Sequence, residues 1–440
     1  MRLVTSFTGS RGVRYPSPDV ARGFMLLLIA LANIPSWVAT TSSYSAPVDT
    51  IDTAWLWART LLVDHRAYPL FALLFGFGLA TMINRRTASG TRAYLQSLPG
   101  VEAGREPTPQ EQAWAREQAT VDARRLVRRR GLWMILFGAA HATLFSGDII
   151  GSYGLAAVVL AGWIAHKHWK RAAVLSVIIT AVSVVMMYNL NSFLASQGLN
   201  AAEIARRGAD SSTATPLSYV FNSVTSWSGT TVMTVLASLV IPAMFLGARL
   251  ADTDLIAHPE RHRRLLAVIG LGGLGLGAVG GIGPAVWATG GTLIVWTAPL
   301  HEMTGLAGAC GWLALLALYA GGPREGGDLT GLRRLASNVG RRSMTAYLSQ
   351  SLLFAAVFLA LPALTGIELH LGEARVAGIA VVVWLVTVVL CAVLERGGHA
   401  GPFETLLRTA VARSERKRPR PAPPSASQPA DTHPETVPAG

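Results

Sequence analysis

The sequence predicts an all-α integral membrane protein with about ten transmembrane helices. Hydrophobic residues make up 51% of the 440 residues, and charged residues only 14%. The apolar residues form long runs rather than amphipathic stripes, which is typical of membrane-spanning helices. These runs do not alternate with period two, as the strands of a transmembrane barrel would. The expected surroundings of most of the chain are therefore a lipid bilayer.

The distribution of the net charge of +13 predicts the topology. An even number of spans places both termini on one side, and 33 of the 38 Lys and Arg residues then fall on that side. Because positively charged loops stay in the cytoplasm, we expect a cell-membrane protein with cytoplasmic N- and C-termini. Charge confined to loops also argues against nucleic acid as a partner. Cys310 and Cys391 both lie within apolar runs, so neither a disulfide nor a metal site is expected.

Three parts of the chain follow from these patterns. Residues 1–22 form a cytoplasmic N-terminus, and residues 23–410 form a polytopic membrane domain. Residues 411–440 end in a proline-rich stretch without apolar periodicity, which predicts a disordered cytoplasmic tail. The predicted spans lie near residues 23–40, 67–84, 131–146, 149–165, 172–194, 227–248, 265–289, 292–320, 343–364 and 375–394. The second, third and fourth of these are short for a hydrocarbon core of about 30 Å.

Three further segments have predicted roles. Residues 51–63 are amphipathic and carry tryptophan, so we expect a helix along the outer membrane interface. Residues 109–130 predict a cytoplasmic helix that runs into the third span. Residues 270–283 are glycine-rich and contain the pattern G-x-G-x-x-G. Because they lie inside an apolar run with no strand before it, they predict a close-packing helix face rather than a dinucleotide site.

Residues 128–154 contain the most informative polar side chains. Three consecutive arginines fix one end of the third span at a membrane surface, and His141 is the single ionisable residue among the fifteen that follow. His141 lies about 16 Å beyond the last arginine along a helix, close to mid-membrane. Asp148 follows seven residues later and would share its face if the helix continued that far. We predict that His141 and Asp148 form a catalytic pair; the alternative is a histidine whose hydrogen bonds are satisfied in the core.

Polar residues in or beside the spans are candidate substrate-binding residues, because burying an unpaired polar group is costly. Each has a structural alternative. Asp19 and Arg22 would form a pair that caps a helix, Tyr347 and Gln350 would bond neighbouring helices, and the arginines would determine topology. The candidates are Asp19, Arg22, Asn33, Arg66, Arg128, Arg129, His301, Glu302, Arg341, Tyr347 and Gln350.

Five segments together resemble a known family. They read SPDVARGFMLLLIALANIP near the start, RAYPLFALLFGFGLA in the second span, RRRGLWMILFGAAHATLFSGDIIGSYG across the third, VGRRSMTAYLSQSLL at the ninth and GPFETLLR after the last. As a set, over about residues 15–410, they resemble bacterial membrane proteins that carry domain of unknown function 418. The sequence departs from the family pattern at Ala346, Leu407 and His65, and a glycine is common at the last of these positions.

The resemblance implies both a fold and an activity. That family is grouped by similarity with transmembrane acyltransferases, which implies an acyltransferase-like helical bundle. The implied reaction moves an acyl group from a cytoplasmic acyl-CoA to a small-molecule or glycan acceptor at the membrane or outer face. No cofactor is expected to be bound, and acyl-CoA would be the donor, with its phosphates met by the arginines at the cytoplasmic mouth.

Two other functions fit the same residues. A small-solute transporter or permease would use the polar groups at mid-membrane as a pathway. A non-catalytic membrane scaffold would use them only to hold helices together. The sequence leaves open whether the protein is an enzyme, which donor and acceptor it uses, and its oligomeric state.

Overall fold

The computed structural model describes most of the chain as α-helix, which confirms the predicted all-α class. Residues 1–14 of the predicted N-terminus and 416–440 of the predicted tail lie outside the described residues. The helix α16 (Pro402–Arg413) includes residues 411–413, so the first residues assigned to the tail are helical. The described residues are 15–38, 49–102, 104–198, 216–323, 329–367, 369 and 371–415.

Seven of the described helices are long and apolar enough to cross a membrane, and a bent pair adds an eighth. This finding confirms a helical membrane protein. The seven are α1 (Ser17–Val38), α2 with α3 (Thr50–Leu62 and Ala67–Gln96), α6 (Trp169–Ser196), α10 (Arg263–Ala288), α11 (Thr297–Ala320), α13 with α14 (Ser343–Ala355 and Leu361–Thr365) and α15 (Glu373–Arg396). In the bent pair, α8 (Pro216–Leu236) and α9 (Val240–Leu250) meet at 56°.

The remaining two predicted spans correspond to shorter apolar segments. One is α5 (Ile150–Ala165), with 16 residues. The other is the last third of α4 (Pro109–Ala142). At 1.5 Å per residue, a helix of that length covers about 24 Å or less, so neither segment crosses a hydrocarbon core of about 30 Å by length alone. The count of ten spans therefore stays a prediction.

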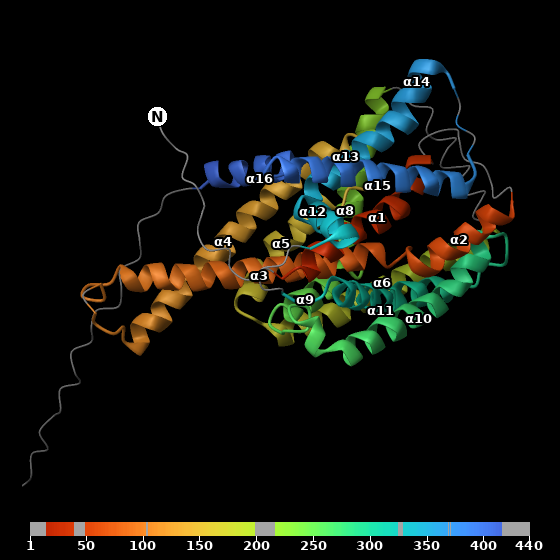
Figure 1. Ribbon diagram of the computed structural model, residues 1–440. Helices are drawn as coiled ribbons and strands as arrows, with labels where there is room; N and C mark the ends of the chain where they lie inside the picture. The colour runs from red at the N-terminus through yellow and green to blue at the C-terminus, as the bar shows by residue number, and fades with distance from the viewer. Residues whose placement is uncertain are drawn as a thin grey trace, which may run out of the picture.

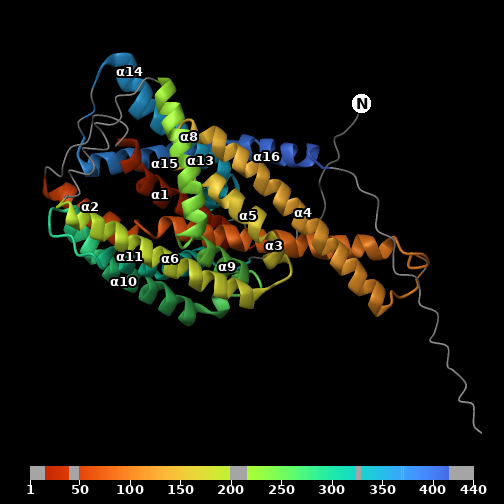
Figure 2. The ribbon, with the colours of Figure 1, turned by 180° about the vertical axis from the view of Figure 1, so that it is seen from behind.

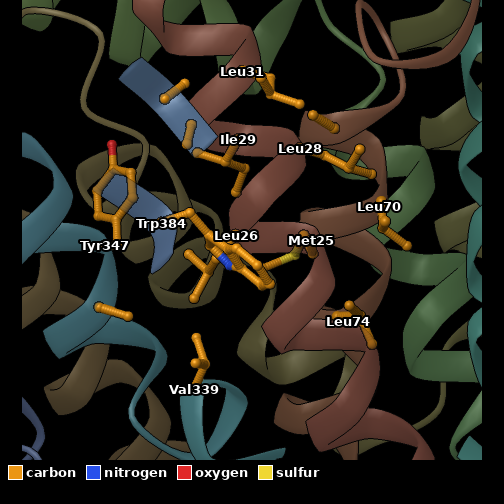
Figure 3. Close-up of a cluster of buried hydrophobic side chains, with 14 of the residues drawn as sticks. Met25, Leu26, Leu28, Ile29, Leu31, Leu70, Leu74, Val339, Tyr347 and Trp384 are labelled. Carbon is orange, nitrogen blue, oxygen red and sulfur yellow. The ribbon is translucent and has the colours of Figure 1, made fainter. Parts of the chain in front are cut away.

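The helix α1 lies at the centre of the bundle, in contact with α3, α11, α13, α15 and the short helix α12 (Gly331–Arg341). Figure 3 shows its side chains between those of the neighbouring helices, with Leu70 and Leu74 on one side and Trp384 on the other. The Trp384 indole also donates a hydrogen bond to the Gly23 carbonyl, 3.1 Å away. In contrast, α6 and α10 expose large apolar side chains such as Val177 and Val268 at their surfaces, which suits contact with lipid.

The helix α4 forms a long hairpin with the end of α3, and this hairpin projects beyond the bundle (Figure 1). The Tyr94 hydroxyl of α3 donates to Asp122 of α4 at 2.6 Å, and the Tyr94 ring meets Trp114 edge-on at 5.5 Å. One continuous helix therefore runs from the projecting hairpin into the bundle. The predicted helix over residues 109–130 is present and continues to Ala142, whereas its cytoplasmic position and the third span stay predictions.

The helix α2 packs on other helices of the same chain, and its predicted position at the outer membrane interface stays a prediction. It forms with α3 an almost continuous stretch of 47 residues, and it packs along α10 and against the start of α15. Its buried face carries Asp52, Leu56 and Thr60. Asp52 accepts a hydrogen bond from the backbone N–H of Ala374 at 2.9 Å. The amphipathic stripe therefore faces two helices of the same protein.

The glycine-rich run of α10 forms a close-packing face, as predicted. A Cβ placed on Gly273 would lie 2.4 Å from the carbonyl oxygen of Ala307 in α11, and one on Gly280 would overlap the Thr304 side chain. The two helices approach this closely only because the glycines lack side chains.

Candidate functional site

His141 and Asp148 meet inside the bundle. His141 is the residue before the last one of α4, and its Nδ1 lies 2.7 Å from Oδ1 of Asp148. Both side chains are buried, at 5% and 0% exposure. The two residues do not share a helix face, because α4 ends at Ala142 and the chain reverses before α5 begins. The predicted pairing is present, but the reversal of the chain brings it about.

Asp148 is held by two further hydrogen bonds. Its Oδ2 accepts from the backbone N–H of Gly151 at 2.8 Å and from the indole N–H of Trp227 at 3.2 Å. Both carboxylate oxygens are therefore engaged, which fixes the orientation of the group that holds His141. A Cβ on Gly138 would lie 2.6 Å from Asp148 Oδ2, so the close approach requires glycine at that position.

One face of α8 covers the pair. The Tyr219 hydroxyl donates to the Leu144 carbonyl at 2.8 Å, and the Ser223 hydroxyl donates to the Ala142 carbonyl at 2.7 Å. These residues precede Trp227 at spacings of four, so all three lie on one side of the helix. Figure 2 shows α8 crossing the side of the bundle where α4 and α5 meet. The sequence analysis did not select these three residues, although polar groups repeating every four positions in an apolar run are a usable signal.

The second ring nitrogen of His141 is the open position of this site. Nε2 is buried and has no hydrogen-bond partner in the described part of the chain. Since Nδ1 faces a carboxylate, the neutral imidazole carries its proton on Nδ1 and has its lone pair on Nε2. The Tyr347 ring meets the imidazole edge-on at 5.4 Å, so this candidate joins the site. Gln350 does not, because its amide bonds the Leu26 carbonyl of α1 at 3.4 Å.

Two of the candidate arginines of α4 are bound to neighbouring groups. Arg128 donates to the Val158 carbonyl of α5 at 3.2 Å. Arg129 forms an ion pair with Glu415, which follows α16, at 3.0 Å. Both contacts support a structural contribution, and the ion pair of Arg129 leaves less charge at that residue for a ligand.

Arg341 is bound in a similar way. It forms an ion pair of 2.5 Å with Glu395 near the end of α15, and Arg342 binds the other oxygen of that carboxylate at 2.9 Å. Arg341 also donates to the side-chain oxygen of Asn338 at 2.6 Å. The pair of arginines therefore ties the start of α13 to the end of α15.

Three other arginines converge at the same end of the bundle. Arg130 lies within electrostatic range of Arg22, Arg408 and Glu404. Arg22 pairs with Asp19 at 3.3 Å, three residues away, and donates to a backbone carbonyl of α3. Within the described residues, neither Arg130 nor Arg408 forms an ion pair. We call Arg22, Arg130 and Arg408 the arginine cluster.

Glu404 lies within electrostatic range of Arg130 and also caps a helix. Its Oε1 accepts from the backbone N–H groups of Met344 and Thr345 at 2.7 and 3.0 Å, and its Oε2 accepts from the Thr345 hydroxyl at 2.5 Å. These donors lie at the start of α13, where a negative charge is stabilised by unpaired N–H groups. The three arginines of the cluster outnumber the two acidic residues beside them, Asp19 and Glu404, and the cluster keeps excess positive charge.

Arg66 lies at the opposite end of the bundle and is fully buried. Its guanidinium donates to the Thr60 carbonyl at 2.9 Å and to the carbonyls of Asp64 and Gly277. Its Nη1 also lies 3.3 Å from Nδ1 of His301. The glycine face of α10 gives this arginine both its space and an acceptor.

Glu302 is the second buried carboxylate that accepts several hydrogen bonds. Its Oε2 lies 2.5 Å from Nδ1 of His65. Its Oε1 accepts from the Tyr68 hydroxyl at 2.5 Å and from the Ser183 hydroxyl at 3.3 Å. The adjacent residues His301 and Glu302 thus contact different partners, as their positions on α11 require. His65 is not among the predicted site residues, although its ionisable side chain just before the second predicted span is a usable signal.

A pocket of about 400 Å³ opens at this end, which we call the pocket end. Asn33 of α1, His65 and His301 line it, and Ile149, the residue after Asp148, contributes to the wall. Asn33 therefore lies near His301, as a shared site requires, whereas Asp19 and Arg22 lie at the other end of α1. The described residues contain no group of three or more His, Cys, Asp or Glu that could hold a metal ion.

The fold and these buried groups define a polytopic helical membrane protein with ionisable residues inside the bundle. Residues 250–414 match the model of a family described as protein of unknown function (DUF418). The match confirms the resemblance for this part of the chain, which includes His301, Glu302 and Tyr347 but not His141 or Asp148. No curated protein and no solved structure matches the chain significantly.

Proposed function

We propose that the protein is a membrane-bound acyltransferase in which His141 is the general base. The supporting observation is the buried pair in which Asp148 anchors Nδ1 while Nε2 has no partner in the described structure. An imidazole oriented in this way can accept a proton at Nε2, and the carboxylate stabilises the resulting imidazolium. A buried polar atom without a partner requires an explanation, and a reacting ligand supplies one.

The proposed reaction transfers the acyl group of a CoA thioester to a hydroxyl or an amine. The acceptor oxygen or nitrogen attacks the thioester carbonyl while its proton passes to Nε2 of His141. The carbon–sulfur bond breaks as the new bond forms, and the departing thiolate takes the proton from the imidazolium. Asp148 would keep the ring in position throughout.

The arginine cluster supports an anionic donor. Phosphate groups bind cations that are not already neutralised, and arginine offers several donors to each phosphate. Arg130 and Arg408 meet this condition better than Arg129 and Arg341, which face carboxylates. We therefore place the phosphates of the donor against the arginine cluster.

Turnover of acyl-CoA by the purified protein in detergent tests the role of His141. His141→Gln should lower the rate by about 100-fold or more, the size of a general-base contribution, without loss of folded protein. Asp148→Asn should lower it less, and His166→Gln, outside the site, should leave it unchanged. Full activity of a folded His141→Gln variant would show that the assignment is wrong.

Binding of acyl-CoA tests the arginine cluster separately. Arg130→Gln and Arg408→Gln should each weaken binding, and the difference from the wild type should shrink at high salt because the ions screen the interaction. Arg116→Gln provides a matched control, since Arg116 is an exposed residue of the same helix α4. Equal affinity in all of these variants would remove the arginine cluster from the donor site.

A small-solute transporter is the second candidate, favoured by the bend of 56° between α9 and α8, the helix that covers the buried pair. Broken helices commonly surround the binding sites of transporters. If this function holds, His141→Gln should alter the pH dependence of solute flux into proteoliposomes, and neither protein should form an acylated product. Detection of an acylated product that depends on His141 decides for the enzyme.

A further inference from the structure

The histidine at the pocket end differs from His141 in its access to a ligand. Both imidazoles place Nδ1 on a buried carboxylate, at 2.5 Å for His65 and 2.7 Å for His141. The His141 side chain is 5% exposed, whereas the His65 side chain is 36% exposed. His65 also lines the pocket of about 400 Å³. Its Nε2 is therefore the nitrogen that remains available to a molecule in the pocket.

The backbone of His65 adopts a conformation that residues other than glycine rarely adopt. His65 has a φ angle of 57°, in the left-handed region that favours glycine. A side chain held in this region marks stored strain, which is concentrated at binding and catalytic sites. The turn between α2 and α3 would form more easily with glycine. The imidazole at this position therefore points to a role in binding rather than in forming the turn.

The charges around the pocket are compensated within the protein. Arg59 forms ion pairs with Asp64 at 3.1 Å and with Glu373 at 3.0 Å, and Glu302 faces His65. Arg66 is fully buried and bonded to carbonyls, so it cannot reach an anion. Among the described residues that line the pocket, Arg59, Asp64 and His65 already face groups of the protein, so an ionic ligand would lose its hydration without gaining an unpaired counter-charge from them.

The pocket nevertheless offers hydrogen-bonding groups beside an aromatic wall. Asn33, Asp64 and the two histidines supply donors and acceptors, and Trp287 lines the pocket with them. Pockets with a few placed polar groups against aromatic side chains orient small molecules that carry both hydroxyl groups and apolar faces.

We propose that this pocket binds a small uncharged molecule with several hydroxyl groups, and that Nε2 of His65 makes a hydrogen bond to one of them. Glu302 acts as the positioning residue for His65, held in turn by Tyr68 and Ser183. If the protein transfers acyl groups, this molecule is the acyl acceptor; its assignment as the acceptor rests on the proposed function. Binding itself does not require a donor.

Calorimetric titration of the full-length protein in detergent, without acyl-CoA, tests the proposal. The probes are glycerol, erythritol and myo-inositol, compared with the charged molecules glucosamine and glucuronate. We expect saturable binding of at least one uncharged probe and weaker binding of both charged ones. Absence of saturable binding by all three uncharged probes, or a preference for a charged probe, would overturn the proposal.

His65→Gly removes the imidazole and places at this position the residue that its φ angle suits. It should weaken binding of the uncharged probe by about tenfold or more, as expected when a hydrogen bond in a binding site is lost. His168→Gln, an exposed histidine outside the pocket, should bind as the wild type does. Undiminished binding by a folded His65→Gly variant contradicts the proposal.

Trp287→Leu provides a second variant if His65→Gly does not fold. It removes the aromatic wall without touching the Glu302 network and should also weaken binding of the uncharged probe. Unchanged affinity of this variant for the uncharged probe would contradict the proposal that the pocket is the binding site. Since neither variant touches His141 or the arginine cluster, binding of acyl-CoA in the absence of an acceptor reports independently on the donor side of the proposed function.

Discussion

Gly138 lies one turn before His141 in α4 and decides whether the contact between His141 and Asp148 can form. A Cβ at this position would approach Asp148 Oδ2 and the backbone N–H of Gly151, each to 2.6 Å. Gly138→Ala should therefore separate α4 from α5 and destabilise the protein by about 1–3 kcal/mol, the usual cost of overpacking. Thermal unfolding in detergent measures this change.

Gly275→Ala is the matched control for this prediction, because a Cβ on Gly275 would meet no atom within 4 Å. Alanine is the better helix former by up to about 1 kcal/mol, so this variant should be as stable as the wild type or slightly more stable. Equal unfolding temperatures for Gly138→Ala and Gly275→Ala would contradict the close approach of α4 and α5.

At the scale of the element, the titratable carboxylate of Glu111 stabilises the start of α4. The Thr108 hydroxyl accepts from the Glu111 backbone N–H, and the Glu111 carboxylate accepts from the Thr108 backbone N–H. The hydrogen bond from Arg105, followed by that from the Thr108 backbone, lowers the pKa of Glu111 to about 2. In the unfolded chain a glutamate has a pKa of about 4.3.

A lowered pKa means that the carboxylate stabilises this helix start above pH of about 4.3 and ceases to do so as the pH falls towards 2. Hydrogen exchange of the first turn of α4, corrected for its intrinsic pH dependence, should show protection at pH 5 that declines below pH 4. Glu111→Gln should lack this dependence, and Glu117→Gln, an exposed residue of the same helix, should retain it. Identical profiles for all three proteins would exclude the cap as the cause.

At the scale of the whole molecule, the charge asymmetry predicts the orientation in the membrane. Reporter fusions at Thr108 and after Pro419 should give a cytoplasmic signal, and a fusion near Ala209 should give a signal from the other side, because 33 of 38 Lys and Arg residues share one side. A non-cytoplasmic signal at Thr108 would reverse the entire topology. The proposed donor side would then have to be reassigned as well.

The arrangement of the bundle separates two sites along α1. The arginine cluster lies where α1 begins, and the pocket lies towards its other end, with Asn33 in its wall. The buried His141–Asp148 pair is connected to the pocket through Ile149. This order suits a donor and an acceptor that approach the pair from opposite sides. It suits a solute pathway equally well. Detection of an acylated product is therefore the experiment that distinguishes the two functions.

The sequence by itself determined the helical membrane class, the close-packing glycine face of α10 and the candidate pair His141 and Asp148. These features follow from local composition and spacing, which can be read without knowing which helices are neighbours. The prediction that the pair shares a helix face needed α4 to continue, and the chain reverses instead.

Only the tertiary structure decided which polar groups are already satisfied. Arg129 and Arg341 find carboxylates at Glu415 and Glu395, whereas Arg130 has none within the described residues. Trp227 and Glu302 each reach partners far away in the sequence. Hydrogen bonds and ion pairs are made between atoms a few ångströms apart, and the sequence distance of their residues carries no information about that separation.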